Sequence, residues 1–262
     1  MAKTRFVGCI AAKGGVGKTT SAINLGAALN FFGKDTIIVD ANITTPNIGI
    51  YLGVPIAPST IHDVLRGKKE IKDVVYEHDN GLKIVPASIS IKDAKKVDIN
   101  RLPNALADLY GHSDFIIVDG CAGLTKESLS IMKSVNEIII ITNPEMPAIT
   151  DALKTIKIAK ELNKEILGVL VTKTNSKNAD ISLNDIESIL ETPIIGIIPE
   201  DRAIKFSQAQ KEPVIYTHPK SASAIQYKKL AADLLNIEYN ENIRYEPEGF
   251  SGWLLRWLGF KD

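Results

Sequence analysis

Cysteine is scarce in this chain, which has only Cys9 and Cys121 among its 262 residues. Two cysteines are too few for a disulfide-stapled scaffold or for a zinc site built from cysteine ligands. Positive charge is not in excess either, because 31 Lys and Arg residues balance 31 Asp and Glu residues. Without a net positive charge the chain as a whole does not attract a phosphate backbone, so we do not expect nucleic-acid binding.

Long apolar runs are also missing from the sequence. No stretch reaches the roughly 18 apolar residues of a membrane-spanning helix, and no apolar signal region follows the first residues. The four histidines show no metal-ligand spacing. We therefore expect a cytoplasmic protein, whose contact with a membrane, if there is one, is peripheral.

What the chain does have is a regular alternation of short β-branched runs and longer amphipathic stretches. Four consecutive isoleucines at 138–141 are typical of a strand buried on both faces of a parallel sheet. The alternation predicts an α/β fold with a doubly wound, mostly parallel sheet flanked by helices. Strands are expected at 6–11, 36–39, 82–85, 115–118, 137–142, 166–171 and 194–198. Helices are expected at 18–31, 61–66, 101–110, 126–133, 148–162, 183–190 and 222–235.

A glycine-rich segment follows the first expected strand and leads into the first long helix. It comprises Gly14, Gly15, Val16, Gly17, Lys18, Thr19 and Thr20. Glycines let the backbone wrap closely around a phosphate chain, and the helix N-terminus favours the negative charge. Lys18 can reach the terminal phosphates, and the Thr19 hydroxyl can ligate magnesium. The segment therefore predicts a P-loop that binds ATP and Mg²⁺.

This loop departs from the general motif at its start, where Ala12 replaces glycine and is followed by an extra lysine, Lys13. The run from Lys13 to Thr19 resembles the deviant P-loop of the MinD/ParA ATPase family. In that family the extra lysine crosses a dimer interface and contacts the nucleotide of the partner subunit. The resemblance implies that ATP, but not ADP, joins two copies of the chain into a homodimer, with Lys13 and Lys18 as catalytic residues.

Two aspartates, Asp40 and Asp119, come directly after expected strands. In a P-loop fold, carboxylates at such strand ends lie close to magnesium and its water shell. We therefore expect Thr19, Asp40 and Asp119 to form the metal site. The run 122–124 (Ala-Gly-Leu), which follows the second aspartate, resembles the second switch of the family, the segment that senses the γ-phosphate.

The first switch departs from the family pattern. Relatives usually carry Asp-x-Asp-x-x-x-x-Asn, whereas residues 40–47 of this chain have Asn42 at the second acidic position. An amide can position a water molecule but cannot take its proton. Because phosphoryl transfer needs little general base, we expect Asp40 and Asn42 to support slow ATP hydrolysis. The alternative is an ATP-bound scaffold with little or no hydrolysis.

Recognition of the base is predicted from the resemblance alone. The residues Pro199, Glu200 and Asp201 resemble the family loop that packs against the base. Thr172 stands near the position where relatives commonly place an asparagine that reads the adenine amino group. The resemblance therefore implies that these four residues contact adenine.

The regular pattern ends after Leu235. We expect a P-loop ATPase domain at 1–235, a polar linker at 236–249 and an amphipathic tail at 250–262. Tryptophan favours the membrane–water boundary, so the tail is predicted to bind an anionic membrane surface. Five apolar residues of the tail share one face of a helix, namely Phe250, Trp253, Leu254, Trp257 and Leu258.

The residues and the resemblance together imply a MinD-like ATPase. One tail binds lipid weakly, but the two tails of an ATP-bound dimer bind together, which makes attachment to the inner face of the cell membrane reversible and nucleotide-dependent. The family implies a role in positioning cell-division or other polar machinery and a partner protein, activator or cargo, that triggers hydrolysis. A ParA-like DNA-partitioning ATPase is the alternative, and the zero net charge and the tryptophan-bearing tail argue against it.

Overall fold

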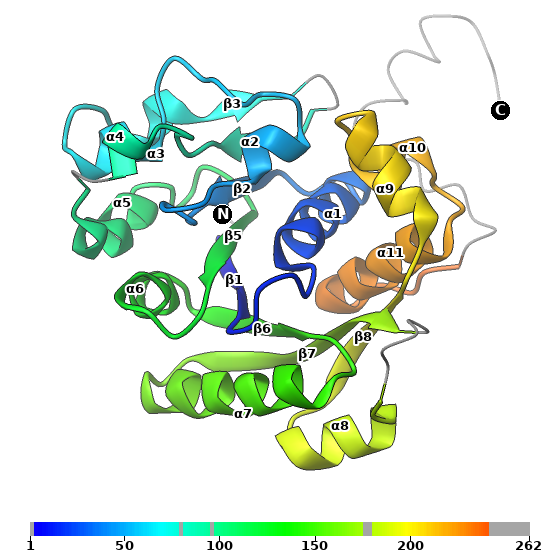
Figure 1. Ribbon diagram of the computed structural model, residues 1–262. Coiled ribbons are helices and arrows are strands. Elements are labelled where there is room, and N and C mark those ends of the chain that lie inside the picture. The colour runs from blue at the N-terminus through cyan, green and yellow to red at the C-terminus, as the bar shows by residue number, and fades with distance from the viewer. Residues whose placement is uncertain (1–2, 79–80, 95–96, 175–179, 241–262) are drawn as a thin grey trace, which may run out of the picture.

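The computed structural model describes residues 3–78, 81–94, 97–174 and 180–240 (Figure 1). In this part of the chain eight strands form one sheet in the order β3–β4–β2–β5–β1–β6–β7–β8. Every neighbouring pair in it is parallel except β3 with β4. The predicted fold, a mostly parallel sheet flanked by helices, is confirmed. The strands are β1 Arg5–Ala11, β2 Thr36–Asp40, β3 Tyr76–Glu77, β4 Lys83–Val85, β5 Phe115–Ala122, β6 Glu137–Thr142, β7 Glu165–Thr174 and β8 Ile194–Pro199.

Helices cover both faces of the sheet (Figure 1). One layer contains α1 Lys18–Phe31, α2 Ile48–Tyr51, α9 Arg202–Ala209, α10 Val214–Thr217 and α11 Ala222–Leu235. The other layer contains α3 Ile61–Leu65, α5 Leu102–Ala107, α6 Lys126–Ser134, α7 Met146–Glu161 and α8 Leu183–Leu190. Strand side chains alternate between the two cores, so Ile116 and Val118 face the second layer while Phe115 and Ile117 face the first.

The seven predicted strands are all found, but several short elements were not predicted. The edge strand β3 has two residues, and α2 and α10 have four each, so none is long enough to show a period. The predicted helix at 101–110 is shorter, because α5 covers Leu102–Ala107 after a 3₁₀ turn at Ile99–Arg101. The remaining short elements are α4 Ile91–Ala94 and a 3₁₀ turn at Ile71–Val74.

The last helix, α11, begins and ends at residues suited to those positions. The Ser221 side chain accepts a hydrogen bond from the Ala224 amide at the N-terminus, and Asn236 ends the helix in a left-handed conformation with φ 53°. The Tyr239 ring then packs edge-on against Phe32, with 5.7 Å between ring centroids. The beginning of the predicted linker therefore lies against the domain.

The rest of the predicted linker, 241–249, and the predicted tail, 250–262, lie outside the described residues. The membrane-binding face, with its five apolar side chains at 250, 253, 254, 257 and 258, stays a prediction. Within the part of the chain that is described, no helix combines the length and the apolar character needed to cross a bilayer.

The order of the strands gathers three strand ends at one edge of the sheet. β1 lies between β5 and β6, and β2 lies on the other side of β5. Asp40, the last residue of β2, is in register with Asp119 of β5. Because these strands are parallel, the glycine-rich loop after β1 and both aspartates meet at the same edge, where doubly wound sheets bind their ligands.

Candidate functional site

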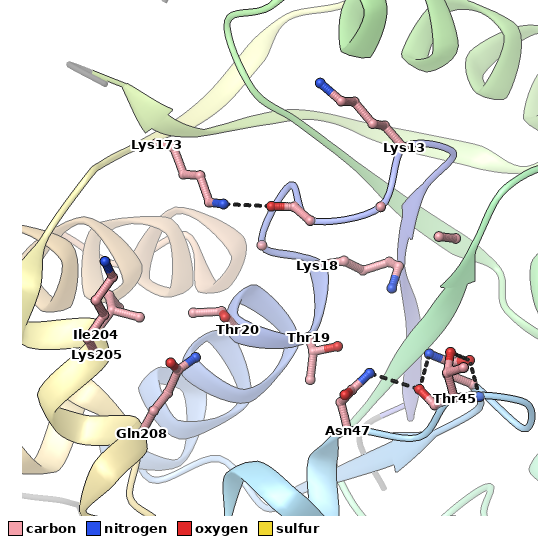
Figure 2. A pocket seen from close by; sticks show the side chains of 15 residues that line it. Lys13, Lys18, Thr19, Thr20, Thr45, Asn47, Lys173, Ile204, Lys205 and Gln208 are labelled. Atoms are coloured by element: carbon pink, nitrogen blue, oxygen red, sulfur yellow. Dashed lines mark hydrogen bonds between the residues drawn. The ribbon is translucent and has the colours of Figure 1, made fainter. Parts of the chain in front are cut away.

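The glycine-rich loop between β1 and α1 forms one wall of a cavity of about 490 Å³ at this edge. Gly15 and Gly17 adopt left-handed conformations, with φ 78° and 89°, which residues with a side chain rarely adopt. Gly17 is the N-cap of α1, so the amides of the first helical turn point into the cavity. The cavity is lined by Lys13, Gly14, Gly15, Gly17, Lys18, Thr19, Thr20, Asn42, Thr45, Asn47, Ala122, Lys173, Ile204, Lys205 and Gln208 (Figure 2).

The end of β7 supports this loop from behind. Thr172 is buried, and its hydroxyl lies 2.5 Å from the carbonyl oxygen of Val16 and 3.1 Å from that of Thr142. The register of β7 against β8 shifts at Lys173, whose φ is 54° and whose Nζ donates a hydrogen bond of 2.7 Å to the Gly15 carbonyl. Thr172 thus braces the loop by its hydroxyl, and its role in reading adenine stays a prediction.

At the centre of the site, Lys18 and Thr19 both contact Asp119. The Thr19 hydroxyl donates a hydrogen bond of 2.6 Å to Asp119 Oδ2, and Lys18 Nζ lies 3.7 Å from Asp119 Oδ1. Asp40 is equally buried beside it and accepts hydrogen bonds from the backbone amides of Asn42, Asn47 and Ile48. All three residues predicted to bind metal, Thr19, Asp40 and Asp119, are therefore brought together.

Burial of the two carboxyl groups changes their protonation. Burial, followed by repulsion from Asp119, raises the pKa of Asp40 to about 7. Burial also raises the pKa of Asp119, against the lowering effects of Lys18 and Thr19. Two ionised carboxylates repel each other when they are buried side by side, and a cation between them offsets this repulsion. The pair therefore favours binding of a cation.

The oxygen atoms of this site suit a hard divalent cation. Asp119 Oδ1 is buried and, among the described residues, has no hydrogen-bond partner. The described part of the chain holds no cluster of three or more His, Cys, Asp or Glu residues fit for a metal. Mg²⁺ does not need such a cluster, because it binds through one or two carboxylates and completes its shell with other oxygens, mostly those of phosphate and water. Thr19 and the two aspartates fit that mode of binding.

The loop after β2, residues 41–47, lines the cavity and is held together by the side chain of Asn42. This side chain is 4% exposed, and its Nδ2 donates a hydrogen bond of 2.6 Å to the Thr45 carbonyl. Its Oδ1 accepts hydrogen bonds from the amide and the hydroxyl of Thr45, at 3.1 and 3.0 Å. Asn47 Nδ2 donates to the same carbonyl at 2.8 Å (Figure 2). Asn42 therefore uses its polar atoms to hold the loop together.

Lys13 does not point toward the same place as Lys18. In Figure 2 the two side chains extend in different directions from the glycine-rich loop. Lys13 Nζ forms an ion pair with Glu145, which lies at the N-terminus of α7, and this contact holds the pKa of Glu145 below its usual range. The Asn143 side chain donates a hydrogen bond of 2.5 Å to the same carboxylate. Lys13 is thus held at the rim of the cavity by its ion pair with Glu145.

The residues predicted to contact the base lie at the end of β8. Pro199 is the last residue of this strand, and the Glu200 amide donates a hydrogen bond to the Thr174 carbonyl at 2.9 Å. Asp201 accepts hydrogen bonds from the Ala203 amide and from Ser223, and so fixes the start of α9 against α11. Their contact with a base stays a prediction.

The wall of the cavity on this side comes from α9, which was not predicted. Ile204, Lys205 and Gln208 line it, and Gln208 also lines an adjoining cavity of about 300 Å³. Asp201, a good N-cap, was the sequence signal that could have revealed this helix.

Comparison with known proteins agrees with this geometry. The ParA family model, described as NUBPL iron-transfer P-loop NTPase, matches residues 3–235. The chain belongs to the MinD/ParA family of P-loop NTPases. It is 34% identical to an ATP-binding protein of Methanocaldococcus jannaschii, over 94% of this chain and 93% of that one.

Several relatives in this family are septum site-determining proteins named MinD. The MinD of Buchnera aphidicola subsp. Acyrthosiphon pisum is 31% identical, over 98% of this chain and 99% of that one. The MinD of Pyrococcus horikoshii, solved in complex with Mg-ADP, is 32% identical and superposes with a TM-score of 0.85, over 88% of this chain and 96% of that one. The resemblance inferred from residues 13–19 is therefore confirmed over most of the chain.

Proposed function

We propose that this protein is an ATPase of the MinD type that dimerises when it binds ATP. The observation that carries the proposal is the pair of lysines in one glycine-rich loop, Lys18 beside the buried aspartates and Lys13 at the rim. Lys18, Thr19 and the first turn of α1 suit the phosphates of a nucleotide bound with Mg²⁺. Lys13 extends away from Lys18 and pairs with Glu145, so its action on a nucleotide in a second copy requires it to exchange this ion pair for the phosphates of that nucleotide.

Hydrolysis by this site is expected to be slow. Catalysis of phosphoryl transfer rests on positioning and on charge stabilisation, for which Lys13, Lys18 and Mg²⁺ supply positive charge. Asn42 supplies no proton acceptor, and its polar atoms already bind Thr45. This engagement of Asn42 favours, as second candidate, an ATP-bound scaffold that turns over very little.

The proposal extends to a membrane through the sequence at 250–262. An isolated helix of this length is marginal in water, so the tail is expected to fold on contact with lipid. Pairing of two tails in an ATP-bound dimer raises avidity by about 10² to 10⁴. Attachment at the inner face of the cell membrane then depends on the bound nucleotide, and release on hydrolysis returns the protein to the cytoplasm.

The proposed role is the positioning of cell-division or other polar machinery, together with a protein partner. MinD of Aquifex aeolicus, which is 27% identical to this chain, has been solved in complex with MinC. We infer that this chain likewise binds a second protein, activator or cargo, in its dimeric state.

Co-sedimentation with anionic liposomes tests this function. The full chain is expected to pellet with ATP and Mg²⁺ and to stay in the supernatant with ADP or without nucleotide. A chain that lacks residues 250–262 is expected to bind ATP normally and to stay in the supernatant throughout. Pelleting of the truncated chain would contradict the role of the tail, and pelleting of the full chain with every nucleotide would contradict control by ATP.

A turnover assay on the same samples separates the two candidates. Release of phosphate that requires Mg²⁺ and rises with liposomes favours the ATPase. ATP-dependent pelleting without measurable phosphate release favours the scaffold.

A further inference from the structure

Glu127 connects two loops of the site that are far apart in the sequence. It lies in the first turn of α6, directly after the loop that follows β5. Its Oε1 accepts a hydrogen bond of 2.6 Å from the amide of Ile43 and lies 3.4 Å from the amide of Thr44. Its Oε2 accepts a hydrogen bond of 3.0 Å from the Thr44 hydroxyl. Both carboxylate oxygens therefore bind the loop 41–47.

The same segment of the loop is held on its other side by His62 of α3. The Ser88 amide donates a hydrogen bond of 3.0 Å to His62 Nδ1, so the proton of the neutral ring is on Nε2. Nε2 then donates to the Ile43 carbonyl at 3.1 Å. Because His62 is fully buried, the neutral ring is a fixed support. The peptide groups on both sides of Ile43 are thus fixed by two different helices.

The contact made by Glu127 connects the loop 41–47 to the glycine-rich loop. Asp40 and Asn42 hold the loop from within the same segment of chain. Glu127 instead belongs to the element that follows Asp119, and the Gly123 amide just before it donates a hydrogen bond of 2.7 Å to the carbonyl of Ala12 in the glycine-rich loop. A continuous series of contacts therefore runs from the glycine-rich loop, through the start of α6, to the loop that carries Asn42 and Asn47 into the cavity.

We propose that Glu127 is a positioning residue that couples the loop after β5 to the loop after β2, so that the two loops respond to the nucleotide together. The inference rests on the proposed nucleotide chemistry of this cavity and deepens it. A change at the loop after β5 moves the first turn of α6, and the Glu127 carboxylate transmits that change to Ile43 and Thr44. Asn42, one residue before Ile43, then shifts relative to the phosphates.

Amide hydrogen exchange on the full chain without nucleotide tests the contact itself. In Glu127→Ala the amide of Ile43 is expected to exchange at least about tenfold faster, because its 2.6 Å hydrogen bond to a charged acceptor is lost and only the 3.1 Å bond to the Ala41 carbonyl stays. The amide of Thr44, which lies 3.4 Å from Glu127, is expected to exchange faster as well. Glu127→Gln keeps one acceptor oxygen at the same length and is expected to recover part of the protection. Glu161→Ala, a change at an exposed glutamate at the end of α7, is the matched control and is expected to leave both amides unchanged.

Steady-state kinetics tests the consequence. Glu127→Ala is expected to lower kcat for ATP about tenfold and to change KM less than about threefold, since the lost contact positions the loop and binds no phosphate. Thr44→Val removes the hydroxyl donor from the other side, and combining it with Glu127→Ala is expected to add little to the effect of Glu127→Ala alone.

Unchanged exchange at Ile43 and Thr44 in Glu127→Ala would overturn the proposal, as would faster exchange with an unchanged kcat. Fully additive effects of the two substitutions on kcat would also overturn it. Exchange needs no turnover, so a wild-type chain without ATPase activity contradicts the ATPase and favours the scaffold, while the contact made by Glu127 is still measured. If Glu127→Ala does not fold, Glu127→Gln and Thr44→Val give the same two readouts.

Discussion

Replacing Asn42 with aspartate gives the first switch the acidic residue that the family pattern predicts there, and it is expected to weaken the fold. The Asn42 amide is buried and donates a hydrogen bond to the Thr45 carbonyl. A carboxylate has no proton to donate, so Asn42→Asp places two acceptors against each other. It also adds a negative charge next to Asp40, whose carboxylate accepts a hydrogen bond from the backbone amide of residue 42.

The size of this effect follows from burial. Loss of a partner at a buried polar group costs about 1–3 kcal/mol. For a chain of this length each kcal/mol lowers the melting temperature by about 2–4 °C. We therefore expect Asn42→Asp to lower the free energy of unfolding by about 1–3 kcal/mol at pH 8. The loss shrinks as the pH falls, because the buried carboxyl binds a proton and its hydroxyl then donates to Thr45.

The matched control is Asn47→Asp. Asn47 donates to the same carbonyl of Thr45, but it is exposed, so water can replace the lost donor. Urea unfolding of both variants without nucleotide, at pH 6 and pH 8, measures the difference. Asn47→Asp is expected to cost less than about 0.5 kcal/mol, as is usual for a surface substitution.

Equal stability of the two variants would refute the reasoning that the Asn42 amide holds the loop. A loss of stability in Asn42→Asp that does not change between pH 6 and pH 8 would refute the explanation by the missing proton. The same variant is expected to hydrolyse ATP faster than the wild type, and phosphate release measures this. Absence of turnover in both proteins would favour the scaffold.

Three further predictions concern other parts of the site and fold. Lys13→Ala is expected to abolish ATP-dependent dimerisation, measured by sedimentation velocity, while ATP affinity changes less than about threefold because Lys13 pairs with Glu145; dimers that persist would contradict this. Asp40 has a pKa of about 7 and must lose its proton to balance the charge of Mg²⁺. The affinity for Mg-nucleotide, measured by calorimetry, is therefore expected to fall by up to about tenfold for each pH unit below 7. Gly168→Ala is expected to cost about 3 kcal/mol or more in urea unfolding, because its Cβ would lie 2.3 Å from Ile195 Cγ2 at φ 150°. The control Gly111→Ala, at φ 81° in open space, is expected to cost about 1 kcal/mol, and equal losses would refute the steric argument.

The centre of the site could be predicted because its signals are local. The residues from Lys13 to Thr20 lie within one turn and the start of one helix, so their spacing alone indicates a phosphate site. Asp40 and Asp119 each end a run that reads as a buried strand. The parallel topology then brings the two aspartates together, although 79 positions separate them in the printed sequence.

The supporting contacts could not be predicted, since no local pattern encodes them. Glu127 lies in the expected helix at 126–133 and Glu145 lies just before the expected helix at 148–162, but their partners lie 84 and 132 positions away. The position of Thr172 relative to the family predicts a contact with the base, which stays a prediction, but no pattern predicts the contacts of its hydroxyl with the carbonyls of Val16 and Thr142. Such pairings follow only from the packing of the sheet and its two helical layers.

The buried aspartates also predict that the stability of this protein depends on pH and on the proposed ligand. A carboxyl group whose pKa is raised by folding binds its proton more tightly in the folded chain, so the empty protein loses stability as the pH rises from about 4 to about 7. A cation bound with nucleotide removes that repulsion, and a ligand at 100 times its Kd adds about 2.7 kcal/mol. On the proposed function, the nucleotide-free chain is therefore expected to unfold more often at neutral pH than the chain bound to Mg-nucleotide, and to be cut faster by a protease.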